Sequence, residues 1–484
     1  HKDSAAQDIV NPASGAVVGK VWNSADRHVA QAYEAAKAAF ETWSRTPAAE
    51  RAAALESFAD LLEENRDDLM ALCVREAGKT VADALAEVRE AVDFCRYYAE
   101  RGRIDFKEGG TRLQGPTGER NILTLHGRGV FACISPWNFP LAIFTGQIAA
   151  ALMAGNSVIA KPAEQTPLIA MLAVRLMHKA GIPAGAVNLL LGDGKIGAAI
   201  VQHENIAGVA FTGSTETARA INMDLAKRKG PIVPLIAETG GQNAMIVDSS
   251  ALPEQVVDDV LLSAFGSAGQ RCSALRVLFL QEEIADKIVR MLGGAMEKLR
   301  VGDPADLSTD VGPVIDSIAH DALKTHRKKL EGFGRLICEV KLGKELTQSG
   351  NFFAPCAFEL NNIKGLTHEV FGPVLHIIRY KKDKLDEVIA DINATGYGLT
   401  FGLHSRIDSV QRHVTGAVRV GNAYVNRPMT GAVVGVQPFG GQGLSGTGPK
   451  AGGPHYLLRF ATEKVVSTDT TAAGGNASLV SLAE

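Results

Sequence analysis

The stretch GSAGQRCSAL, residues 266–275, places one cysteine among small and polar residues. A cysteine of a protein core usually has apolar neighbours, whereas Cys272 stands between Arg271 and Ser273. A thiolate attacks an electrophilic carbon best where positive charge or dipoles favour its ionised form. Small neighbours also leave room for a substrate and a cofactor. Two interpretations of Cys272 stay open on this pattern: a catalytic nucleophile, or a free thiol of the core.

Three further polar residues have side chains that could act on a carbonyl group. Asn138, in SPWNFP, follows a predicted strand, and an amide N–H is a suitable donor to an oxyanion. Glu238, in IAETGGQNAMIV, stands between apolar residues and two glycines, a setting that raises the pKa of a carboxyl group and suits a general base. Glu369 precedes an apolar strand in HEVFGPVL. Each of the three is equally compatible with a structural role, as a turn asparagine or as a capping or ion-paired glutamate.

The stretch GDGKIG matches the dinucleotide fingerprint GxGxxG through Gly192, Gly194 and Gly197. It follows the predicted strand VNLLL and opens a predicted helix, which is the context that the fingerprint requires. The alternative is a helix N-terminus that needs glycine for packing.

Two more loops between a strand and a helix are candidates for the same ligand. In FTGSTETA, Gly213 permits close approach of the backbone, and Ser214 and Thr215 can donate hydrogen bonds to a phosphate at a helix N-terminus. In AKPAEQTP, Lys161 and Glu164 stand just beyond a strand, where they can hydrogen-bond sugar hydroxyls. The alternative for these charges is a solvated loop.

The elements that would position these residues alternate along the chain. The short apolar runs GVFACISP, SVIAKPA, VNLLLG and GVAFTGS are separated by helical stretches such as TPLIAMLAVRLMHKAG. Buried strands that alternate with helices predict βαβ units and a parallel sheet. A second α/β series is expected from about 243 to 425. The apolar stretch from Leu141 predicts a buried helix that runs into a buried strand, with a membrane span as the alternative.

The remaining segments have other patterns. Residues from about 26 to 100 carry apolar side chains at helical spacing. Residues 108–127 predict two strands around a Gly/Pro turn, which have little core of their own and should lie against another part of the chain or another subunit. The stretch FATEKVVSTDTT predicts a final strand, and we expect the last dozen residues to be mobile.

Composition excludes several classes of protein. The chain has 484 residues, 46% hydrophobic and 21% charged, with a net charge of -3. This predicts a soluble globular protein of two or three domains, with no basic excess for nucleic acid or an anionic membrane. The six cysteines have no CxxC spacing and no histidine cluster beside them, so we expect a reducing, cytoplasmic location and no metal site. We expect no signal peptide, and the absence of an initiator Met predicts a fragment or a trimmed chain.

The motifs SPWNFP, AKPAEQTP, FTGST, AETGG, GQRC, EVFGPV and QPFGGQGLSG occur in the order seen in the aldehyde dehydrogenase superfamily, which the chain resembles from about 130 to 446. The resemblance implies an α/β fold with three parts. A Rossmann-like NAD-binding domain would comprise residues 1–107 and 128–238, and a catalytic domain residues 239–438. Residues 108–127 and 439–472 would form a small β element for homo-oligomerisation, followed by a mobile tail at 473–484.

The resemblance also implies a mechanism. Cys272 attacks an aldehyde to give a thiohemiacetal, whose alkoxide is held by the Asn138 side chain and the Cys272 N–H. Hydride transfer to the nicotinamide leaves a thioester, and Glu238 activates the water that hydrolyses it. The phosphates would lie at the FTGST helix, with GDGKIG on the adenine side. The residues expected to bind NAD are Lys161, Glu164, Gly192, Gly194, Gly213, Ser214, Thr215, Glu369 and Phe371.

A narrower resemblance is carried by TGERN, GQRCSALRVLFLQ and the stretch from Asn426 to Phe460. These look like the dehydrogenase module of the bifunctional proline utilization A enzymes, which oxidises L-glutamate γ-semialdehyde to L-glutamate with NAD. Ser273, Gly431 and Ala432 would anchor the substrate carboxylate. Phe139 and Phe439 would enclose its aliphatic chain, and Glu90 would face its ammonium, with a solvated helix face as the alternative for Glu90. In these enzymes an FAD-dependent proline dehydrogenase domain, absent from this chain, is covalently linked.

Two positions depart from the common family pattern, and two other functions stay open. Ala218 stands where many relatives have glycine, and Gln242 stands where lysine is commoner. The alternatives are a dehydrogenase for another ω-semialdehyde and a non-catalytic scaffold of the same fold. Glu164 near the ribose 2′-hydroxyl would repel the extra phosphate of NADP.

Overall fold

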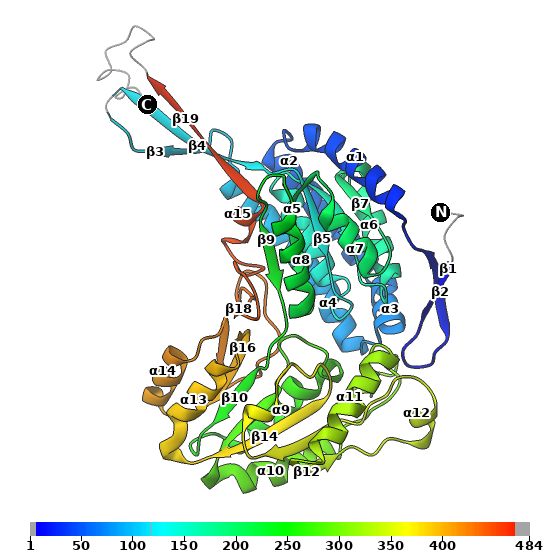
Figure 1. Cartoon of the computed structure of the whole chain (residues 1–484), viewed down its shortest axis with the longest axis vertical. Helices are drawn as coiled ribbons and strands as arrows, with labels where there is room; N and C mark the ends of the chain where they lie inside the picture. The colour runs from blue at the N-terminus through cyan, green and yellow to red at the C-terminus, as the bar shows by residue number, and fades with distance from the viewer. Residues whose placement is uncertain (1–5, 117, 470–484) are drawn as a thin grey trace.

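The computed structural model describes residues 6–116 and 118–469. Two sheets of mainly parallel strands form the body of the molecule, and a thin arm extends from it (Figure 1). The predicted α/β fold class is confirmed. The mobile tail expected at 473–484 lies outside the described residues.

The first sheet is parallel throughout and has the order β7-β6-β5-β8-β9. Its strands are β5 (Val130–Ile134), β6 (Ser157–Lys161), β7 (Val187–Leu189), β8 (Ile206–Thr212) and β9 (Leu235–Glu238). Successive side chains of a strand point to opposite faces. Accordingly Phe131 and Cys133 of β5 pack into one core, whereas Val130, Ala132 and Ile134 pack into another. The sheet is therefore covered on both faces, and the parallel sheet predicted from the apolar runs is confirmed.

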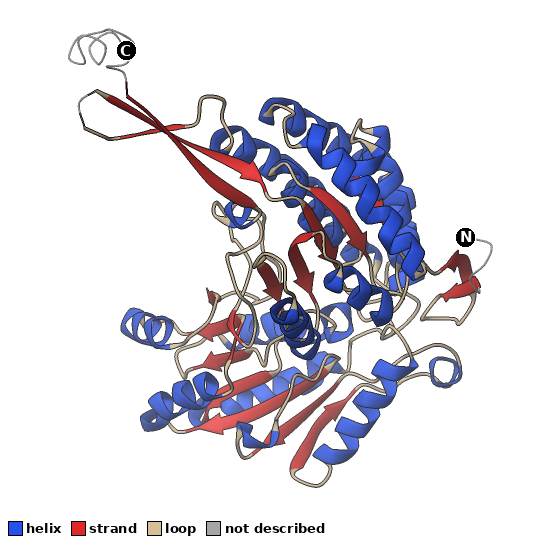
Figure 2. Cartoon of the chain, turned by 45° about the horizontal axis from the view of Figure 1, so that its top comes forward, coloured by secondary structure: helices blue, strands red, loops and turns tan. Residues whose placement is uncertain are grey.

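Eight helices surround this sheet in the described chain (Figure 2). They are α1 (Asp26–Trp43), α2 (Ala48–Glu64), α3 (Arg66–Ala77), α4 (Val81–Asp105), α5 (Ala142–Met153), α6 (Pro167–Lys179), α7 (Gly194–Gln202) and α8 (Thr215–Lys227). The helical prediction for residues 26–100 is confirmed. The apolar stretch from Leu141 forms the buried helix α5 and then β6, as predicted. In the described part of the chain no helix is both long and apolar enough to cross a membrane.

The second sheet has the order β12-β13-β14-β11-β10-β16-β17, in which only the edge strand β12 is antiparallel to its neighbour. Its strands are β10 (Ala244–Val247), β11 (Val277–Gln281), β12 (Gly334–Glu339), β13 (Cys356–Leu360), β14 (Val374–Tyr380), β16 (Thr400–His404) and β17 (Asn422–Val425). Its helices are α9 (Pro253–Phe265), α10 (Glu282–Met296), α11 (Ser317–Leu330), α12 (Lys344–Gln348), α13 (Leu385–Ala394) and α14 (Asp408–Ala417). The second α/β series predicted at 243–425 is therefore confirmed.

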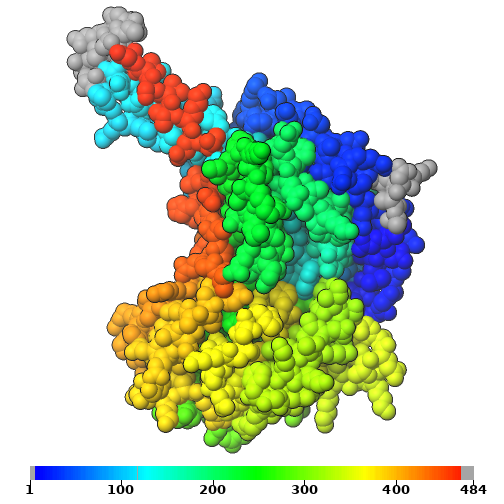
Figure 3. Space-filling model, viewed as in Figure 1, coloured from blue at the N-terminus to red at the C-terminus, as the bar shows by residue number. Residues whose placement is uncertain are grey.

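The arm consists of three antiparallel strands, β3 (Thr111–Leu113), β4 (Glu119–Gly127) and β19 (Ala461–Asp469). It stands clear of the body in the space-filling view (Figure 3). Within the range 439–472 that the sequence groups with this hairpin, residues 461–469 pair with β4. The preceding part holds β18 (Gln442–Gly443), which pairs with β15 (Tyr397–Gly398), and the short helix α15 (Tyr456–Arg459). The role of the arm in oligomerisation stays a prediction.

A second hairpin, β1 (Ala6–Val10) and β2 (Val17–Trp22), was not predicted. Its turn is closed by Asn11, whose carbonyl accepts from Gly15 N at 2.7 Å and whose side chain accepts from Ala13 N at 2.8 Å. Gln7 of β1 donates to the carbonyl of Glu164 at 3.2 Å, so the hairpin supports a loop of the first sheet.

The two large sheets meet through particular edges. Glu238 ends β9 and Lys161 ends β6, so both stand at the carboxyl edge of the first sheet. Cys272 comes shortly before β11, and Glu369 shortly before β14, so both stand at the amino edge of the second sheet. The Asn138 side chain, which follows β5, donates to the Gln270 carbonyl at 3.1 Å and joins the two edges. The predicted site residues therefore gather where one sheet ends and the other begins.

Candidate active site

Cys272 lies on a loop whose backbone is sharply turned. Before it, Ser267, Ala268 and Gly269 all have positive φ angles, 57°, 54° and 65°. A non-glycine residue in this region costs of order 1–3 kcal/mol, which is a strain typical of functional sites. At Gly269 a Cβ atom would lie 2.3 Å from the carbonyl oxygen of Gly372. The small residues around Cys272 thus serve close packing of backbone on backbone.

Two buried side chains that the sequence did not single out hold this loop. Asn243 donates through Nδ2 to the carbonyls of Cys272 and Ala274, at 2.6 and 2.9 Å. The guanidinium of Arg276 donates to the carbonyls of Gly269 at 2.6 Å and Arg271 at 3.0 Å. All four acceptors are carbonyl groups of the main chain, so no side-chain motif in the sequence indicates these hydrogen bonds.

The Cys272 thiol is partly exposed, but carboxylates dominate its surroundings. Burial raises the pKa of Cys272 to about 12, and Glu369, Glu238 and Glu90 act in the same direction. Arg276 is the cation that lowers this pKa. Arg271, the cation next to Cys272 in the sequence, forms an ion pair with Asp83. At neutral pH the thiol of the free protein is therefore protonated.

Glu238 lies against a glycine-rich segment. One carboxylate oxygen, Oε2, accepts from Gly441 N at 2.9 Å, while Oε1 is buried and has no hydrogen-bond partner among the described residues. A Cβ atom at Gly440 would lie 2.8 Å from Oε1, so a side chain there would collide with the carboxylate. Burial raises the pKa of Glu238 to about 8, against smaller lowering effects of Gly441 N–H and Lys450. A carboxyl group with that pKa can take up and release a proton near neutral pH.

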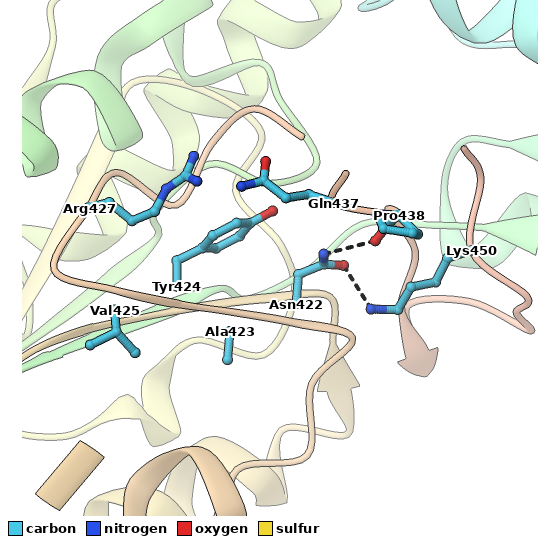
Figure 4. A pocket seen from close by; sticks show the side chains of 8 residues that line it. All are labelled: Asn422, Ala423, Tyr424, Val425, Arg427, Gln437, Pro438 and Lys450. Carbon is cyan, nitrogen blue, oxygen red and sulfur yellow. Dashed lines mark hydrogen bonds between the residues drawn. The ribbon is translucent and has the colours of Figure 1, made fainter. Parts of the chain in front are cut away.

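Lys450 lines a surface pocket of about 360 Å³ together with Asn422 and Pro438 (Figure 4), and its charge lowers the pKa of Glu238. Its Nζ donates to the carbonyl of Gly421 and, at 3.3 Å, to Oδ1 of Asn422. The Asn422 amide in turn donates to the carbonyl of Pro438 at 3.0 Å. The ammonium is thus held beside the carboxylate without forming an ion pair with it.

Asn138 is buried between the two sheets. Its Nδ2 donates to the Gln270 carbonyl at 3.1 Å, which leaves the second N–H of the amide for another acceptor. The main-chain carbonyl of Asn138 accepts from Lys79 Nζ at 2.7 Å. Asn138 is therefore bound to the loop of Cys272, and Glu238 is close enough to act on the pKa of the thiol, so the structure brings the three predicted catalytic residues together.

Glu369 and Phe371 stand on the other side of Cys272. Glu369 Oε1 forms an ion pair with Arg276 at 3.1 Å. A Cβ atom at Gly240 would lie 1.6 Å from Glu369 Oε2, so only glycine leaves room for this carboxylate. Phe371 packs edge-on against Trp137, with ring centroids 5.6 Å apart, and lies under the Arg276 guanidinium at 5.3 Å.

Lys161 and Glu164 lie together at the end of β6. Their charged atoms are 4.0 Å apart, with Lys161 buried and Glu164 about half exposed. Burial lowers the pKa of Lys161, an effect that Glu164 and Asp193 oppose. A Cβ atom at Gly197 would lie 3.6 Å from Cδ of Lys161, so the lysine stem runs beneath α7.

The N-termini of α7 and α8 differ in charge. At α7 the N-cap is Asp193, whose carboxylate accepts from Lys195 N at 2.9 Å. At α8 the N-cap is the neutral Ser214, whose Oγ accepts from Thr217 N at 3.2 Å. A phosphate is stabilised by a helix N-terminus and repelled by a carboxylate at the N-cap, so the cap of α8 suits phosphate better than that of α7, although Glu216 follows in the first turn of α8. The Thr215 hydroxyl donates to the Leu444 carbonyl at 3.3 Å, which turns it away from that end.

These groups fit a dinucleotide. The α8 end with Gly213 before it suits phosphates, Lys161 and Glu164 suit one sugar, and Glu369 suits the other. Gly192 and Gly194 precede and open α7, and a Cβ atom at Gly194 would meet no atom within 4 Å. The open side of that helix end leaves room for a flat base.

The residues predicted to bind the substrate are only partly brought together. The Phe139 ring lies 4.2 Å from Lys79 Nζ and 5.9 Å from the Arg271 guanidinium carbon. Burial raises the pKa of Glu90 to about 8, and Glu90 in turn acts on the pKa of Cys272. Ser273 is buried directly after Cys272.

Three other predicted substrate residues come from the segment after β17. Gly431 has a φ of 82° and open space beside it, with Ala432 following. Phe439 pairs with Ala451 through two backbone hydrogen bonds of 2.9 and 2.8 Å. In the part of the chain that the structure describes, no hydrogen bond or ring contact joins Gly431, Ala432 or Phe439 to Cys272 or Phe139.

Gln242, whose role the sequence left open, links this site to the loop before Glu369. Its Nε2 donates to the Leu366 carbonyl at 2.8 Å. Within residues 6–116 and 118–469, no group of three or more His, Cys, Asp or Glu side chains could hold a metal ion.

Comparison with known proteins places this geometry among related chains. The model of the aldehyde dehydrogenase family matches residues 1–466. The bifunctional protein PutA of Klebsiella aerogenes is 54% identical over 467 residues, which are 95% of this chain and 34% of that protein. The chain therefore spans about a third of the length of this relative.

Two further relatives match nearly the whole of this chain. The 1-pyrroline-5-carboxylate dehydrogenase of Geobacillus sp. (strain WCH70) is 36% identical over 469 residues, 95% of this chain and 89% of that protein. A crystal structure of a proline utilization A variant from Bradyrhizobium japonicum has a TM-score of 0.92 and 59% identity, covering 94% of this chain and 46% of that one. The resemblance inferred from the seven motifs is confirmed.

Replacing Glu369 by glutamine should make the Cys272 thiol more acidic. The change removes the nearby charge that raises the pKa of the thiol most and frees Arg276, which lowers it. Alkylation by iodoacetamide, followed by mass spectrometry of the Cys272 peptide without cofactor, should accelerate by about threefold for each unit of pKa, because the thiolate fraction rises while a less basic thiolate is a weaker nucleophile. The exposed Glu387→Gln is the control. An unchanged or slower alkylation of Glu369→Gln would show that the acids do not govern this thiol.

Proposed function

The chain belongs to the aldehyde dehydrogenase family, and from this premise we propose that it oxidises L-glutamate γ-semialdehyde, the open form of 1-pyrroline-5-carboxylate, to L-glutamate with NAD as hydride acceptor. The observation that carries the proposal is the convergence of Cys272, Asn138 and Glu238 between the two sheets. The name of the Geobacillus relative, which this chain matches over most of its length, supports the choice of substrate.

The first half of the reaction forms a carbon–sulfur bond at Cys272. The thiol gives its proton to solvent, its sulfur attacks the aldehyde carbon, and the carbonyl oxygen becomes an alkoxide. The free N–H of the Asn138 amide and the N–H of Cys272 donate to this alkoxide, as donors of an oxyanion hole do. Bound NAD supplies the acceptor for the hydride that leaves the thiohemiacetal carbon.

The second half releases the acid. Glu238 takes a proton from water, and the oxygen of that water adds to the thioester carbon. The carbon–sulfur bond then breaks and returns Cys272 as thiolate, which regains a proton. Because burial raises the pKa of Glu238 to about 8, this carboxylate is a stronger base than an exposed one.

The charges near Phe139 support a substrate that carries an ammonium group. Lys79 pairs with Glu87 and Arg271 pairs with Asp83, so both cations are matched by an acid. Glu90 is the remaining acid of this group and has no counter-charge paired with it among the described residues; burial, and then the charge of Glu87, raises its pKa to about 8. An ammonium bound beside Glu90 would supply that charge. Ser273 and the N–H groups of Gly431 and Ala432 would take the carboxylate.

The proposal also covers a partner domain, an oligomeric state and a location in the cell. The relatives named bifunctional support a covalently linked FAD-dependent proline dehydrogenase domain as partner in proline catabolism. We also propose a homo-oligomer that forms through the arm, and a location in the cytoplasm, in keeping with the cysteine usage.

Replacing Cys272 by alanine should abolish NADH formation while NAD still binds. The variant lacks the atom that bonds to the substrate but keeps Lys161, Glu164 and the α8 end. NADH absorbance and NAD titration by fluorescence quenching measure the two properties. Cys338→Ala, at a cysteine that is also partly exposed, should keep full activity. Measurable turnover by Cys272→Ala would exclude the covalent mechanism.

Replacing Glu90 by glutamine should weaken the preference for an amino-acid aldehyde. Because the pKa of Glu90 is raised to about 8, its negative charge develops as the pH rises through that value, so L-glutamate should bind the unaltered protein more tightly at pH 8.5 than at pH 7. Glu90→Gln should lose this dependence and about tenfold in affinity at pH 8.5, roughly the effect of one charge-assisted hydrogen bond.

The control for Glu90 is Glu100→Gln, an exposed position on the same helix α4. In kcat/KM, the unaltered protein should prefer glutamate semialdehyde over succinic semialdehyde, which lacks the ammonium. The opposite preference would assign the chain to another ω-semialdehyde.

Replacing Glu164 by glutamine should increase the use of NADP. A carboxylate near the ribose 2′-hydroxyl repels the phosphate that NADP carries there, and the neutral amide does not. The ratio of kcat/KM for NAD to that for NADP should fall by about tenfold or more, equivalent to roughly 1.4 kcal/mol. Glu204→Gln, an exposed position, should leave the ratio unchanged. An unaltered ratio in Glu164→Gln would remove this residue from the sugar site.

A further inference from the structure

Lys79 is a buried cation that the proposed reaction does not use. It follows Gly78, which ends α3 with a φ of 66°, and only 3% of it is exposed. Lysine is almost never buried to this degree unless it is paired. Its surroundings therefore decide why the chain keeps a charge here.

The Lys79 ammonium has three partners within the first half of the chain. Its Nζ lies 3.0 Å from Glu87 Oε1, 2.7 Å from the carbonyl oxygen of Asn138 and 4.2 Å from the centre of the Phe139 ring. The last two partners are consecutive residues of the loop between β5 and α5. One ammonium thus binds both the main chain and the side chain of that loop.

Glu87 holds the far end of the same loop. Its second oxygen, Oε2, accepts from Leu141 N at 3.3 Å and from Ala142 N at 2.8 Å. These N–H groups belong to the start of α5, whose N-cap residue makes no side-chain hydrogen bond. The Lys79–Glu87 pair therefore fixes residues 138 and 139 through the cation and residues 141 and 142 through the anion.

The loop so fixed carries the amide that faces the Cys272 loop. Lys79 holds the carbonyl of Asn138, while the side-chain amide of the same residue donates to Gln270. An oxyanion donor acts only within about 2.7–3.1 Å of the developing charge. A small shift of the Asn138 main chain would therefore move its amide out of range.

We propose that Lys79 is a positioning residue for the reaction, which through the Asn138 carbonyl sets the place of the oxyanion donor at Cys272. The inference rests on the proposed function in assigning that donor role to Asn138. Lys79 is placed against neither the reacting atoms nor the sulfur, so its effect on kcat passes through Asn138, whereas its contact with Phe139 and its charge near Glu90 bear on the KM for the aldehyde.

A double-mutant cycle tests this dependence. Lys79→Met by itself leaves Glu87 buried without its counter-charge, so it is combined with Glu87→Gln, whose amide oxygen can still accept from the start of α5. The pair should lower kcat at least about tenfold, within the range that loss of an oxyanion donor produces. The KM for NAD should change by less than about twofold, because the α8 end and Lys161 are untouched.

The same pair is then made in the Asn138→Ala protein. If Lys79 acts through Asn138, the pair should change kcat there by less than about twofold, since residues that act as a unit are not additive. An equal loss of kcat in both backgrounds, or full kcat in a folded pair variant, would overturn the proposal. Lys79→Gln with Glu87→Gln should keep kcat within about threefold, because the glutamine amide can still donate to the Asn138 carbonyl.

If the variant with Lys79→Met and Glu87→Gln does not fold, the single change Lys79→Arg tests the proposal instead. The guanidinium keeps the charge opposite Glu87 but has a larger fork, so it should displace the Asn138 carbonyl and lower kcat at an unchanged melting temperature. This loss should vanish in the Asn138→Ala background, and an arginine enzyme with the original kcat would overturn the proposal. All assays use glutamate semialdehyde or succinic semialdehyde, whichever gives the higher kcat/KM. Activity in Cys272→Ala would refute the proposed function, whereas additivity in the cycle refutes only the role of Lys79.

Discussion

One hydrogen bond joins the two halves of the site, from the Asn138 amide to the carbonyl of Gln270 at 3.1 Å. Asn138 follows a strand of the first sheet, and Gln270 lies two residues before Cys272 on the way into the second. Neither sheet alone holds both loops, so the distance between the donor and the sulfur depends on how the sheets are set against each other. Glycines make this approach possible, because Gly240 and Gly440 leave room for the carboxylates of Glu369 and Glu238.

The charges of the site follow from the same junction. The two edges bring Glu238 and Glu369 near one thiol, and α4 adds Glu90; burial raises the pKa of the thiol most, and these acids act in the same direction. A thiol in this setting stays protonated until positive charge or a base comes near it. This arrangement protects the sulfur from adventitious electrophiles and oxidants in the free protein, since the thiolate is the reactive form. Arg276 is the nearest cation, yet its ion pair with Glu369 offsets much of its effect.

Much of this structure could be predicted from the sequence, and the rest could not for definite reasons. Apolar runs closed by Gly, Pro or Ser predicted the strands. The ends of these strands then located Lys161, Ser214 and Glu238, because a parallel sheet brings its carboxyl ends to one edge. The partners of Lys79 and Arg276 could not be found in this way. They include the Asn138 carbonyl, 59 positions from Lys79, and the Gly372 carbonyl, 96 positions from Arg276, and a carbonyl is a group that every residue has. The literal GxGxxG match was also ambiguous, since only the structure shows the Asp193 carboxylate at the start of α7.

The arm has a consequence for biosynthesis. Strand β4 finds its long partner in β19, and Thr124 bonds to the carbonyl of Lys464, 340 positions later. At a translation speed of about 5–20 residues per second, on the order of half a minute passes between the synthesis of β4 and that of β19. The core of the first sheet is also incomplete during this interval, because the Asn156 amide and the ring of Phe131 contact Phe460. A ribosome-bound nascent chain of this protein thus carries an unpaired edge of β4 and an unfinished core until residues 460–469 have emerged.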